Sequence, residues 1–230
     1  MLRRSCPVPA TGAPPWPARV RAAAAAPIAR HLSQQAARPR GPIGRLLARI
    51  WLRETAAVND TAVDLLKPAR GERICEIGFG PGRTLARLAA AGADIIGVET
   101  SALMLRTAAR RNAGPIAAGR ITLHHGDGTV LPLPDASLDA VLGVHTIYFW
   151  PDPPATLADI ARTLHPGGRL VLAFRDGEHA LPARLDPAIY RVPSTTAATE
   201  WLHHAGFGDV VVERKPDIAR TIVWLTATAA

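Results

Sequence analysis

Cysteine and lysine are scarce in this chain of 230 residues, and each shortage narrows the kind of protein it can be. Cys6 and Cys75 are far apart, so they suggest neither a disulfide framework nor a metal-ligand spacing, which fits a reducing compartment. Lysine occurs only at Lys67 and Lys215, so arginine carries nearly all the positive charge, as is common in proteins from GC-rich bacterial genomes. Apolar runs are no longer than a strand, so the sequence predicts no membrane span.

Acidic residues are absent from residues 1–53, which contain ten arginines; the first acid is Glu54. Subtracting these ten charges from the net charge of +8 leaves −2 for residues 54–230. The high isoelectric point therefore belongs to the N-terminal segment, whereas a nucleic-acid-binding protein needs its basic patch on the folded surface. We therefore expect no nucleic-acid partner.

Residues 1–40 are rich in Pro, Ala and Arg, have little apolar periodicity, and are predicted to form a disordered leader. Such a leader is typical of an organellar transit peptide or of a misassigned bacterial start codon, and we prefer a cytoplasmic bacterial location. From residue 42 to 52 the pattern becomes helical, with five apolar residues on one face. This helix either caps a binding pocket or packs on the domain, and packing is our preferred interpretation.

The rest of the chain alternates strands and helices. Strands are predicted at residues 73–77, 95–99, 121–124, 140–144, 169–174, 209–214 and 220–227, and helices at 55–66, 83–91, 102–112 and 154–164. This order predicts one α/β domain, residues 41–230, with a doubly wound, mostly parallel, Rossmann-like sheet of seven strands. The connection between the last two strands is too short for a parallel crossover, so one strand near the C-terminus is antiparallel.

A glycine-rich turn follows the first predicted strand, with Gly78, Gly80 and Gly82 at alternate positions. Glycines allow a sharp turn and a close approach to a ligand, at the sheet edge where α/β proteins bind nucleotide-like cofactors. The spacing is not that of a dinucleotide fingerprint, which would have its third glycine at Arg83. Glu76 would repel a pyrophosphate but attract an ammonium group, so we expect an adenosine cofactor without a pyrophosphate.

Residues 76–82 resemble the first motif of the class I S-adenosylmethionine-dependent methyltransferases, an acidic residue followed by x-Gly-x-Gly-x-Gly. The resemblance implies S-adenosylmethionine as cofactor, with contacts from Glu76, Gly78, Phe79, Gly80 and Gly82. At the end of the second strand, Glu99 can accept hydrogen bonds from both ribose hydroxyls, beside Thr100. Met104, on the next helix, either contacts the adenine or packs in the core.

Two further stretches extend the resemblance to about residues 70–175. Residues 126–139 are similar to the family's Gly-Asp-Ala…Leu-Pro-Phe-x-Asp-x-Ser-Phe-Asp stretch, which implies that Asp127 accepts a hydrogen bond from the adenine amino group, next to Gly128. Residues 164–170 resemble the Leu-x-Pro-Gly-Gly-x-Leu turn that ends a helix and begins strand five. The nearest resemblance is to bacterial proteins related to the ubiquinone and menaquinone biosynthesis methyltransferases. Neighbouring histidines at 124 and 125 lack a third ligand, so no metal site is predicted.

Specificity is expected at the end of the fourth strand. His145 is the candidate general base for a phenol or enol, or else a residue that contacts the cofactor or lines the pocket. Tyr148 and Trp150 either line the acceptor pocket or pack in the core, and residues 176–196 are expected to cover the acceptor. The strand end lacks the Asn/Asp-Pro-Pro-aromatic motif of amino-group methylation.

These patterns predict methyl transfer to an oxygen or carbon atom of a small apolar or aromatic molecule. The alternatives are an NAD-dependent oxidoreductase, against which the glycine spacing argues, and a non-catalytic binding protein that retains the fold. The sequence does not indicate an oligomeric state.

Overall fold

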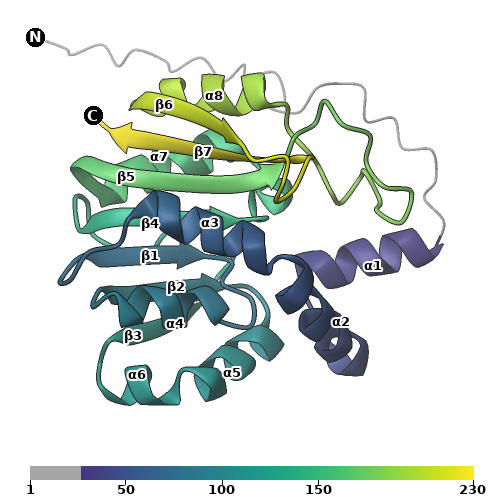
Figure 1. Ribbon diagram of the computed structural model, residues 1–230, viewed down its shortest axis with the longest axis horizontal. Coiled ribbons are helices and arrows are strands. Elements are labelled where there is room, and N and C mark those ends of the chain that lie inside the picture. Colours follow the sequence, from purple (N-terminus) through teal and green to yellow (C-terminus); the bar gives the residue numbers. More distant parts are fainter. Residues whose placement is uncertain (1–26) are drawn as a thin grey trace, which may run out of the picture.

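The structure is a computed structural model that describes residues 27–230 (Figure 1). Its centre is a seven-stranded sheet in the order β3-β2-β1-β4-β5-β7-β6. The strands are β1 Arg73–Ile77, β2 Asp94–Glu99, β3 Ile121–His125, β4 Leu138–Val144, β5 Leu164–Arg175, β6 Phe207–Arg214 and β7 Ile222–Ala229. Strand β7 is antiparallel to both of its neighbours, and the pairs among β1 to β5 are parallel. The predicted sheet, with one antiparallel strand near the C-terminus, is confirmed.

Helices cover both faces of this sheet, as predicted. Four match predicted helices: α3 Ala56–Leu66, α4 Arg83–Ala90, α5 Ala102–Arg111 and α7 Pro153–Thr163. Consecutive residues of the central strand point into two different cores, because Ile74 packs with α3 and α4 while Cys75 packs with α7 and α8. Strands buried on both faces are typical of parallel sheets.

Three short elements were not predicted: α6 Ala113–Ala117, α8 Thr195–His204 and the 3-10 helix η1 Ile147–Phe149. Helix α8 begins where the Ser194 hydroxyl accepts a hydrogen bond of 3.1 Å from the backbone N–H of Ala197, so Ser194 is its N-cap residue. Ser194 lies within residues 176–196, which were expected to cover the acceptor. Strand β5 begins at residue 164, five residues earlier than predicted. The Pro-Gly-Gly turn lies inside it, and its pairing with β4 shifts from Leu164 to Arg169 there.

Helix α1, Pro27–Ala37, lies within the stretch predicted to be disordered, residues 1–40. The physical reason is a tertiary contact: the buried hydroxyl of Ser33 accepts a hydrogen bond of 2.7 Å from the backbone N–H of Asp186. A contact between residues so distant in sequence leaves no local pattern. Residues 1–26 lie outside the described part of the chain.

Helix α2, Gly41–Glu54, forms at the predicted place but packs through a different face. Gly44 and Ala48 are its buried residues, whereas Leu46 is 59% exposed and Ile43 is 50% exposed. The small residues allow close contact, since a Cβ at Gly44 would lie only 2.9 Å from Gln35. The predicted apolar packing face is therefore wrong. Across residues 27–230, none of the helices combines the length and apolarity needed to cross a membrane.

Candidate active site

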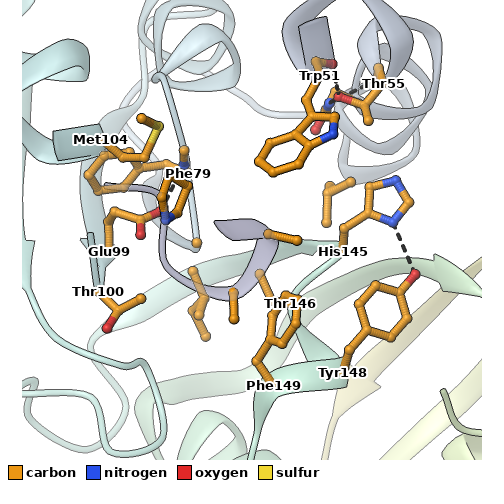
Figure 2. Close-up of a pocket in the computed structure, with 18 of the residues that line it drawn as sticks. Trp51, Thr55, Phe79, Glu99, Thr100, Met104, His145, Thr146, Tyr148 and Phe149 are labelled. Carbon is orange, nitrogen blue, oxygen red and sulfur yellow. Dashed lines mark hydrogen bonds between the residues drawn. The ribbon is translucent and has the colours of Figure 1, made fainter. Parts of the chain in front are cut away.

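A cavity of about 430 Å³ lies at the carboxyl ends of β1, β2 and β4. Figure 2 shows its two ends: Phe79, Glu99 and Met104 lie at one, and His145 and Tyr148 at the other. Helices α1 and α2 form part of its wall, so the sequence alternative in which the helix at 42–52 caps the pocket describes the structure better than packing alone. A cleft of this size suits a small ligand.

The glycine-rich turn brings the backbone to the cavity wall. Gly78 has a φ of 70° and donates a hydrogen bond of 2.7 Å to Val98, and an added Cβ would lie 2.3 Å from the Thr146 side chain. Gly80 has a φ of 52°, and an added Cβ would meet nothing within 4 Å, because it would enter the open space. Both residues line the cavity. Gly82 does not line the cavity. A Cβ at Gly82 would come within 2.7 Å of Ala108, so this glycine allows close packing of the turn against α5.

Glu99 joins the glycine turn to the second strand. One carboxylate oxygen accepts a hydrogen bond of 3.0 Å from Gly80 N–H, and the other accepts one of 2.8 Å from Ser101 N–H. Burial raises the pKa of Glu99 above its usual value. Glu99 lines the cavity together with Thr100, and the predicted neighbours Phe79 and Met104 do so as well. The structure therefore brings four predicted site residues, Glu99 among them, together in the wall of one cavity.

Glu76 lies behind this wall and does not line the cavity. One of its oxygens accepts a hydrogen bond from the Thr84 hydroxyl, and the other, Oε2, is buried and has no partner among the described residues. Burial raises the pKa of Glu76 to about 8. A buried acceptor without a partner is costly, so this oxygen is suited to a donor that a bound ligand or a water molecule supplies.

Asp127 lines the cavity at the same end. Its Oδ1 accepts hydrogen bonds from the hydroxyl of Thr129, at 2.7 Å, and from its N–H, at 3.0 Å, which hold the pKa of Asp127 below its usual value. Gly128 is not part of the wall; a Cβ there would lie 2.4 Å from Ile77. Across residues 27–230 no group of His, Cys, Asp and Glu side chains could hold a metal ion.

His145 marks the opposite end. It has a φ of 59°, a left-handed conformation that is uncommon for a residue with a side chain. Its Nδ1 lies 3.0 Å from the hydroxyl oxygen of Tyr148, and this oxygen accepts a hydrogen bond from the backbone N–H of Arg175. Burial, assisted by the positive charge of Arg175, lowers the pKa of His145 to about 4. The imidazole is therefore neutral at neutral pH.

Aromatic rings enclose this end. Tyr190 lies 4.5 Å from Tyr148 and 5.1 Å from Phe149, measured between ring centroids. Trp51 reaches into the cavity from α2 (Figure 2). Tyr148 and Trp150 satisfy both predicted alternatives, because they line the cavity and are also buried in the core.

Several lining residues were not singled out from the sequence as site residues: Trp51, Thr55, Asn59, Phe149, Arg175 and Arg184. Trp51 and Asn59 are linked through Thr55, whose hydroxyl donates to the Trp51 carbonyl at 2.8 Å and whose carbonyl accepts from Asn59 at 2.8 Å. Trp51 stands in a stretch predicted to be helical, and Phe149 lies between Tyr148 and Trp150, which the sequence had already suggested as pocket or core residues. Nothing local in the sequence separates them from ordinary core residues.

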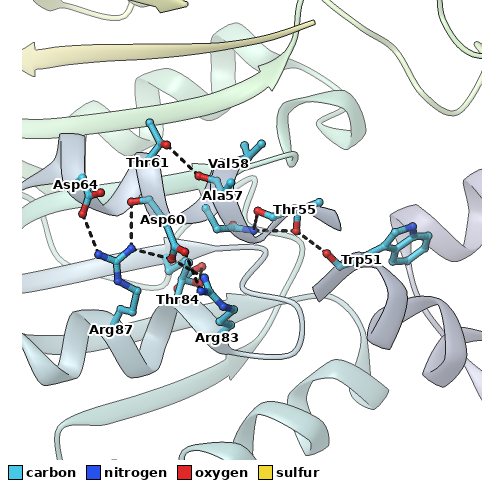
Figure 3. A network of polar contacts seen from close by, with 12 residues as sticks. Trp51, Thr55, Ala57, Val58, Asp60, Thr61, Asp64, Arg83, Thr84 and Arg87 are labelled. Carbon is cyan, nitrogen blue, oxygen red and sulfur yellow. Dashed lines mark hydrogen bonds and ion pairs between the residues drawn. The ribbon is translucent and has the colours of Figure 1, made fainter. Parts of the chain in front are cut away.

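Beside the cavity, an ion-pair network joins α3 to α4 (Figure 3). Asp60 accepts hydrogen bonds from Arg83 at 2.8 Å and from Arg87 at 2.7 Å, and Arg87 also pairs with Asp64 at 2.8 Å. Arg83 is the first residue of α4, directly after the glycine turn. The network therefore ties that turn to the helix that carries Asn59.

Comparison with known proteins agrees with this geometry. The family described as "Methyltransferase domain" matches residues 75–172. The demethylmenaquinone methyltransferase of Clavibacter sepedonicus is 31% identical over 173 residues, covering 70% of this chain and 66% of that protein. The O-methyltransferase cnsE of Penicillium expansum is 33% identical over 118 residues, covering 51% and 43%. The chain thus spans between 43% and 66% of the length of these relatives.

A solved structure from Thermotoga maritima, described as an S-adenosylmethionine-dependent methyltransferase and possible histamine N-methyltransferase, has the same fold. It is 25% identical with a TM-score of 0.60, and the alignment covers 79% of this chain and 94% of that one. The chain belongs to the S-adenosylmethionine-dependent methyltransferases, and S-adenosylmethionine is the cofactor of this family.

The residues present fit that cofactor. An open space lies where a Cβ of Gly80 would stand, so the backbone can approach a ligand closely. Two carboxylates, of Glu99 and Asp127, line the same end and offer acceptors for hydroxyl and amino groups. The unpartnered oxygen of Glu76 lies behind the turn, where a positively charged group bound nearby would favour the ionised form of this carboxyl group.

Proposed function

We propose that this protein transfers a methyl group from S-adenosylmethionine to an oxygen or carbon atom of a small aromatic or apolar molecule. The observation that carries the proposal is a single cavity that joins the glycine turn and Glu99 to a chamber of aromatic rings beside His145. The name of one relative, an O-methyltransferase, supports oxygen as the accepting atom, and the name of another, a demethylmenaquinone methyltransferase, supports a quinone-type acceptor.

For the cofactor, we propose that Glu99 holds the ribose hydroxyls, with Thr100 beside it, and that Asp127 accepts from the adenine amino group. Met104 is 2% exposed and lines this end, so it serves the adenine and the core together. Backbone groups of Gly78, Phe79 and Gly80 form the wall along the rest of the cofactor.

Three predicted contact residues act through this wall in our proposal. Gly82 and Gly128 keep the two turns closely packed, because each leaves no room for a Cβ. A bound ammonium group would favour the ionised form of Glu76 behind the turn, and the carboxylate would then attract that group without touching the cofactor directly.

When bound, S-adenosylmethionine supplies a methyl group that is already activated on a positively charged sulfur. The task of the chain is therefore to align the acceptor and to exclude water, and positioning alone can supply much of the rate. His145 is neutral at neutral pH and so can accept a proton, but a pKa of about 4 makes it a weak base. We propose that its larger contribution is to line and order the acceptor end.

We keep a cytoplasmic, bacterial setting and the lack of a nucleic-acid partner as part of this proposal. The buried Cys75 is a free thiol, which agrees with a reducing compartment. The net charge of −2 for residues 54–230 gives the catalytic portion no general attraction to nucleic acid.

Isothermal titration of the full chain with S-adenosylmethionine, S-adenosylhomocysteine and NAD tests the cofactor site. We expect micromolar binding of both sulfur compounds, none of NAD, and loss of binding in Glu99→Ala. Glu200→Ala, on the exposed face of α8 and outside the cavity, is the matched control and should bind as the wild type does.

Binding of NAD alone would point to an oxidoreductase instead, and binding of none of the three would favour a non-catalytic protein. A screen with radiolabelled S-adenosylmethionine and phenol, enol and amine acceptors then tests the accepting atom. Labelling of amines only would overturn the proposed oxygen or carbon specificity.

A further inference from the structure

Two arginines line the acceptor end of the cavity: Arg175, at the end of β5, and Arg184, in the segment that follows. In the part of the chain that the structure describes, neither guanidinium group takes part in an ion pair. Exposed surface arginines such as Arg110 also lack ion pairs, but Arg175 and Arg184 differ from them because they line the cavity. Arginine is the side chain best suited to hold a planar anion through paired hydrogen bonds.

The acid nearest in sequence is already occupied. Asp176 follows Arg175 directly, but its carboxylate accepts hydrogen bonds of 2.9 Å from Arg214 and 2.8 Å from the Thr195 hydroxyl. Asp176 is buried in this arrangement, so it serves the packing of α8. The positive charge of Arg175 is thus left to the cavity.

Other acids of the cavity lie elsewhere. Glu99 and Asp127 belong to the cofactor end, where backbone groups hold them. Glu54, the third acidic residue of the wall, is exposed at the end of α2 and makes no ion pair with either arginine in the described chain. The acceptor end therefore has an excess of positive charge.

Aromatic rings stand beside this charge. Both arginines act on Tyr190: their positive charges partly oppose the burial that raises its pKa to about 12. Tyr190 is also in ring contact with Tyr148 and Phe149. Guanidinium groups next to a cluster of rings form a surface that complements an aromatic molecule with a negative charge.

We infer that the methyl acceptor is an aromatic molecule bearing a carboxylate or another compact anionic group, which Arg175 and Arg184 hold while its ring packs against Tyr148, Phe149 and Tyr190. The inference rests on the proposed function and names the acceptor class of the same site.

Charge balance gives the physical reason. The cofactor brings a positive sulfonium into a cavity whose wall includes two guanidinium groups, of which Arg175 is partly buried and Arg184 is exposed. Like charges repel more strongly at Arg175, because less water screens them there. An anionic acceptor offsets these charges, whereas a neutral one leaves them uncompensated. Neutral His145 adds no further positive charge.

The transfer step is balanced for a phenolic acceptor of this class. A bond forms between the phenol oxygen and the methyl carbon, while the bond between that carbon and sulfur breaks. The electron pair of the broken bond stays on sulfur, which becomes a neutral thioether, and the phenol proton passes to the solvent. The carboxylate takes no part in the bond changes and serves only for binding.

A matched pair of probes tests the inference: 3,4-dihydroxybenzoate and its neutral amide, 3,4-dihydroxybenzamide. Each is titrated into the full chain saturated with S-adenosylhomocysteine. We expect the carboxylate to bind about tenfold more tightly than the amide. Arg175→Gln and Arg184→Gln should each reduce this preference, and the double variant should abolish it.

Three controls separate the possible causes. Arg110→Gln, on the exposed side of α5 and outside the cavity, should keep the full preference. Arg184→Lys keeps a charge without the planar fork and should keep part of it. The affinity for S-adenosylhomocysteine should be equal in all variants, which shows that each folds.

The outcomes distinguish the two proposals. If the wild type binds S-adenosylhomocysteine but binds both probes equally, or binds neither, the anionic acceptor is overturned and the proposed function stands. If the wild type does not bind S-adenosylhomocysteine, the proposed function fails and the inference fails with it.

Discussion

The two ends of the cavity recognise their ligands by different means. The cofactor end consists of backbone turns fixed by hydrogen bonds, such as those from Gly78 to Val98 and from Gly80 to Glu99. The acceptor end consists of side chains, with rings from η1 and guanidinium groups from β5 and the segment after it. Changes of side chain can therefore alter the acceptor without disturbing the cofactor.

The ends also differ in charge. Carboxylates line the cofactor end, where Glu99 and Asp127 accept hydrogen bonds from the backbone. Arg175 and Arg184 line the other, without ion pairs in the described chain. In our proposal this difference orients a bound pair of substrates along the cavity, because each end attracts the opposite charge.

The largest expected effect comes from closing the cofactor end. Gly80→Val places a side chain in the open space beside Gly80, and we expect the affinity for S-adenosylhomocysteine to fall roughly a hundredfold or more. Gly119→Val is the matched control, because Gly119 also has a positive φ, of 71°, and open space around it, but lies outside the cavity. Titration calorimetry measures both. Equal losses would mean that backbone strain, and not the blocked space, explains the result.

At the acceptor end, Tyr148→Phe removes the hydroxyl that links His145 to the Arg175 backbone. The Arg175 N–H then lacks its acceptor, so we expect the free energy of unfolding in urea to fall by about 1–3 kcal/mol. Binding of S-adenosylhomocysteine should be unchanged. Tyr190→Phe keeps its ring and should have a smaller effect; a loss of cofactor binding in Tyr148→Phe would show that the two ends are not separable.

Opposite pH dependences should separate the two ends. The pKa of Glu76 is raised from 4.5 to about 8, so its contribution to stability is full below pH 4.5 and is lost as the pH rises through 8. Glu76→Gln should therefore be less destabilised than the wild type on going from neutral pH to about pH 9. Thermal unfolding across this range measures it, and parallel curves for the two proteins would contradict it.

The sign reverses at His145, whose pKa is lowered from 6.5 to about 4. Its contribution is present above pH 6.5 and is lost as the pH falls through 4. His145→Asn should therefore lose less stability than the wild type as the pH falls toward 4, and asparagine also tolerates the positive φ. Thermal unfolding measured down to about pH 4 tests this expectation. If His145→Asn loses stability with falling pH as steeply as the wild type, His145 is not the cause of the loss.

The smallest effect concerns the support of the cofactor end. Asp60 contacts two arginines and Asp64 only one, and all these groups are partly exposed. We expect Asp60→Asn to cost about 1 kcal/mol of unfolding free energy and Asp64→Asn clearly less. Urea unfolding in high salt should narrow the difference, and an equal cost for the two would show that the shared position of Asp60 is unimportant.

The cofactor end could be predicted from sequence because its geometry depends on local spacing. Gly78, Gly80, Glu99 and Asp127 line the cavity as the motifs suggested. Motif membership alone did not predict contact, however. Glu76 lies behind the wall, because a strand places alternate side chains on opposite faces.

The acceptor end could not be predicted in the same way. Arg175 and Tyr190 both line this end because the long connection between β5 and α8 packs there. Trp51 belongs to α2, which precedes the first strand. Likewise, α1 is held by a bond between Ser33 and Asp186, 153 residues apart. Such contacts depend on the whole fold, which no local pattern records.

The segment from α1 to α2 makes hydrogen bonds near both ends of the cavity. Its Pro39 carbonyl accepts a hydrogen bond of 2.6 Å from the Ser101 hydroxyl near the cofactor end, and its Ser33 accepts one from Asp186 in the acceptor cover. Lifting this segment would therefore uncover the two ends in one motion. We expect exchange of the used cofactor and departure of the methylated product to share that motion.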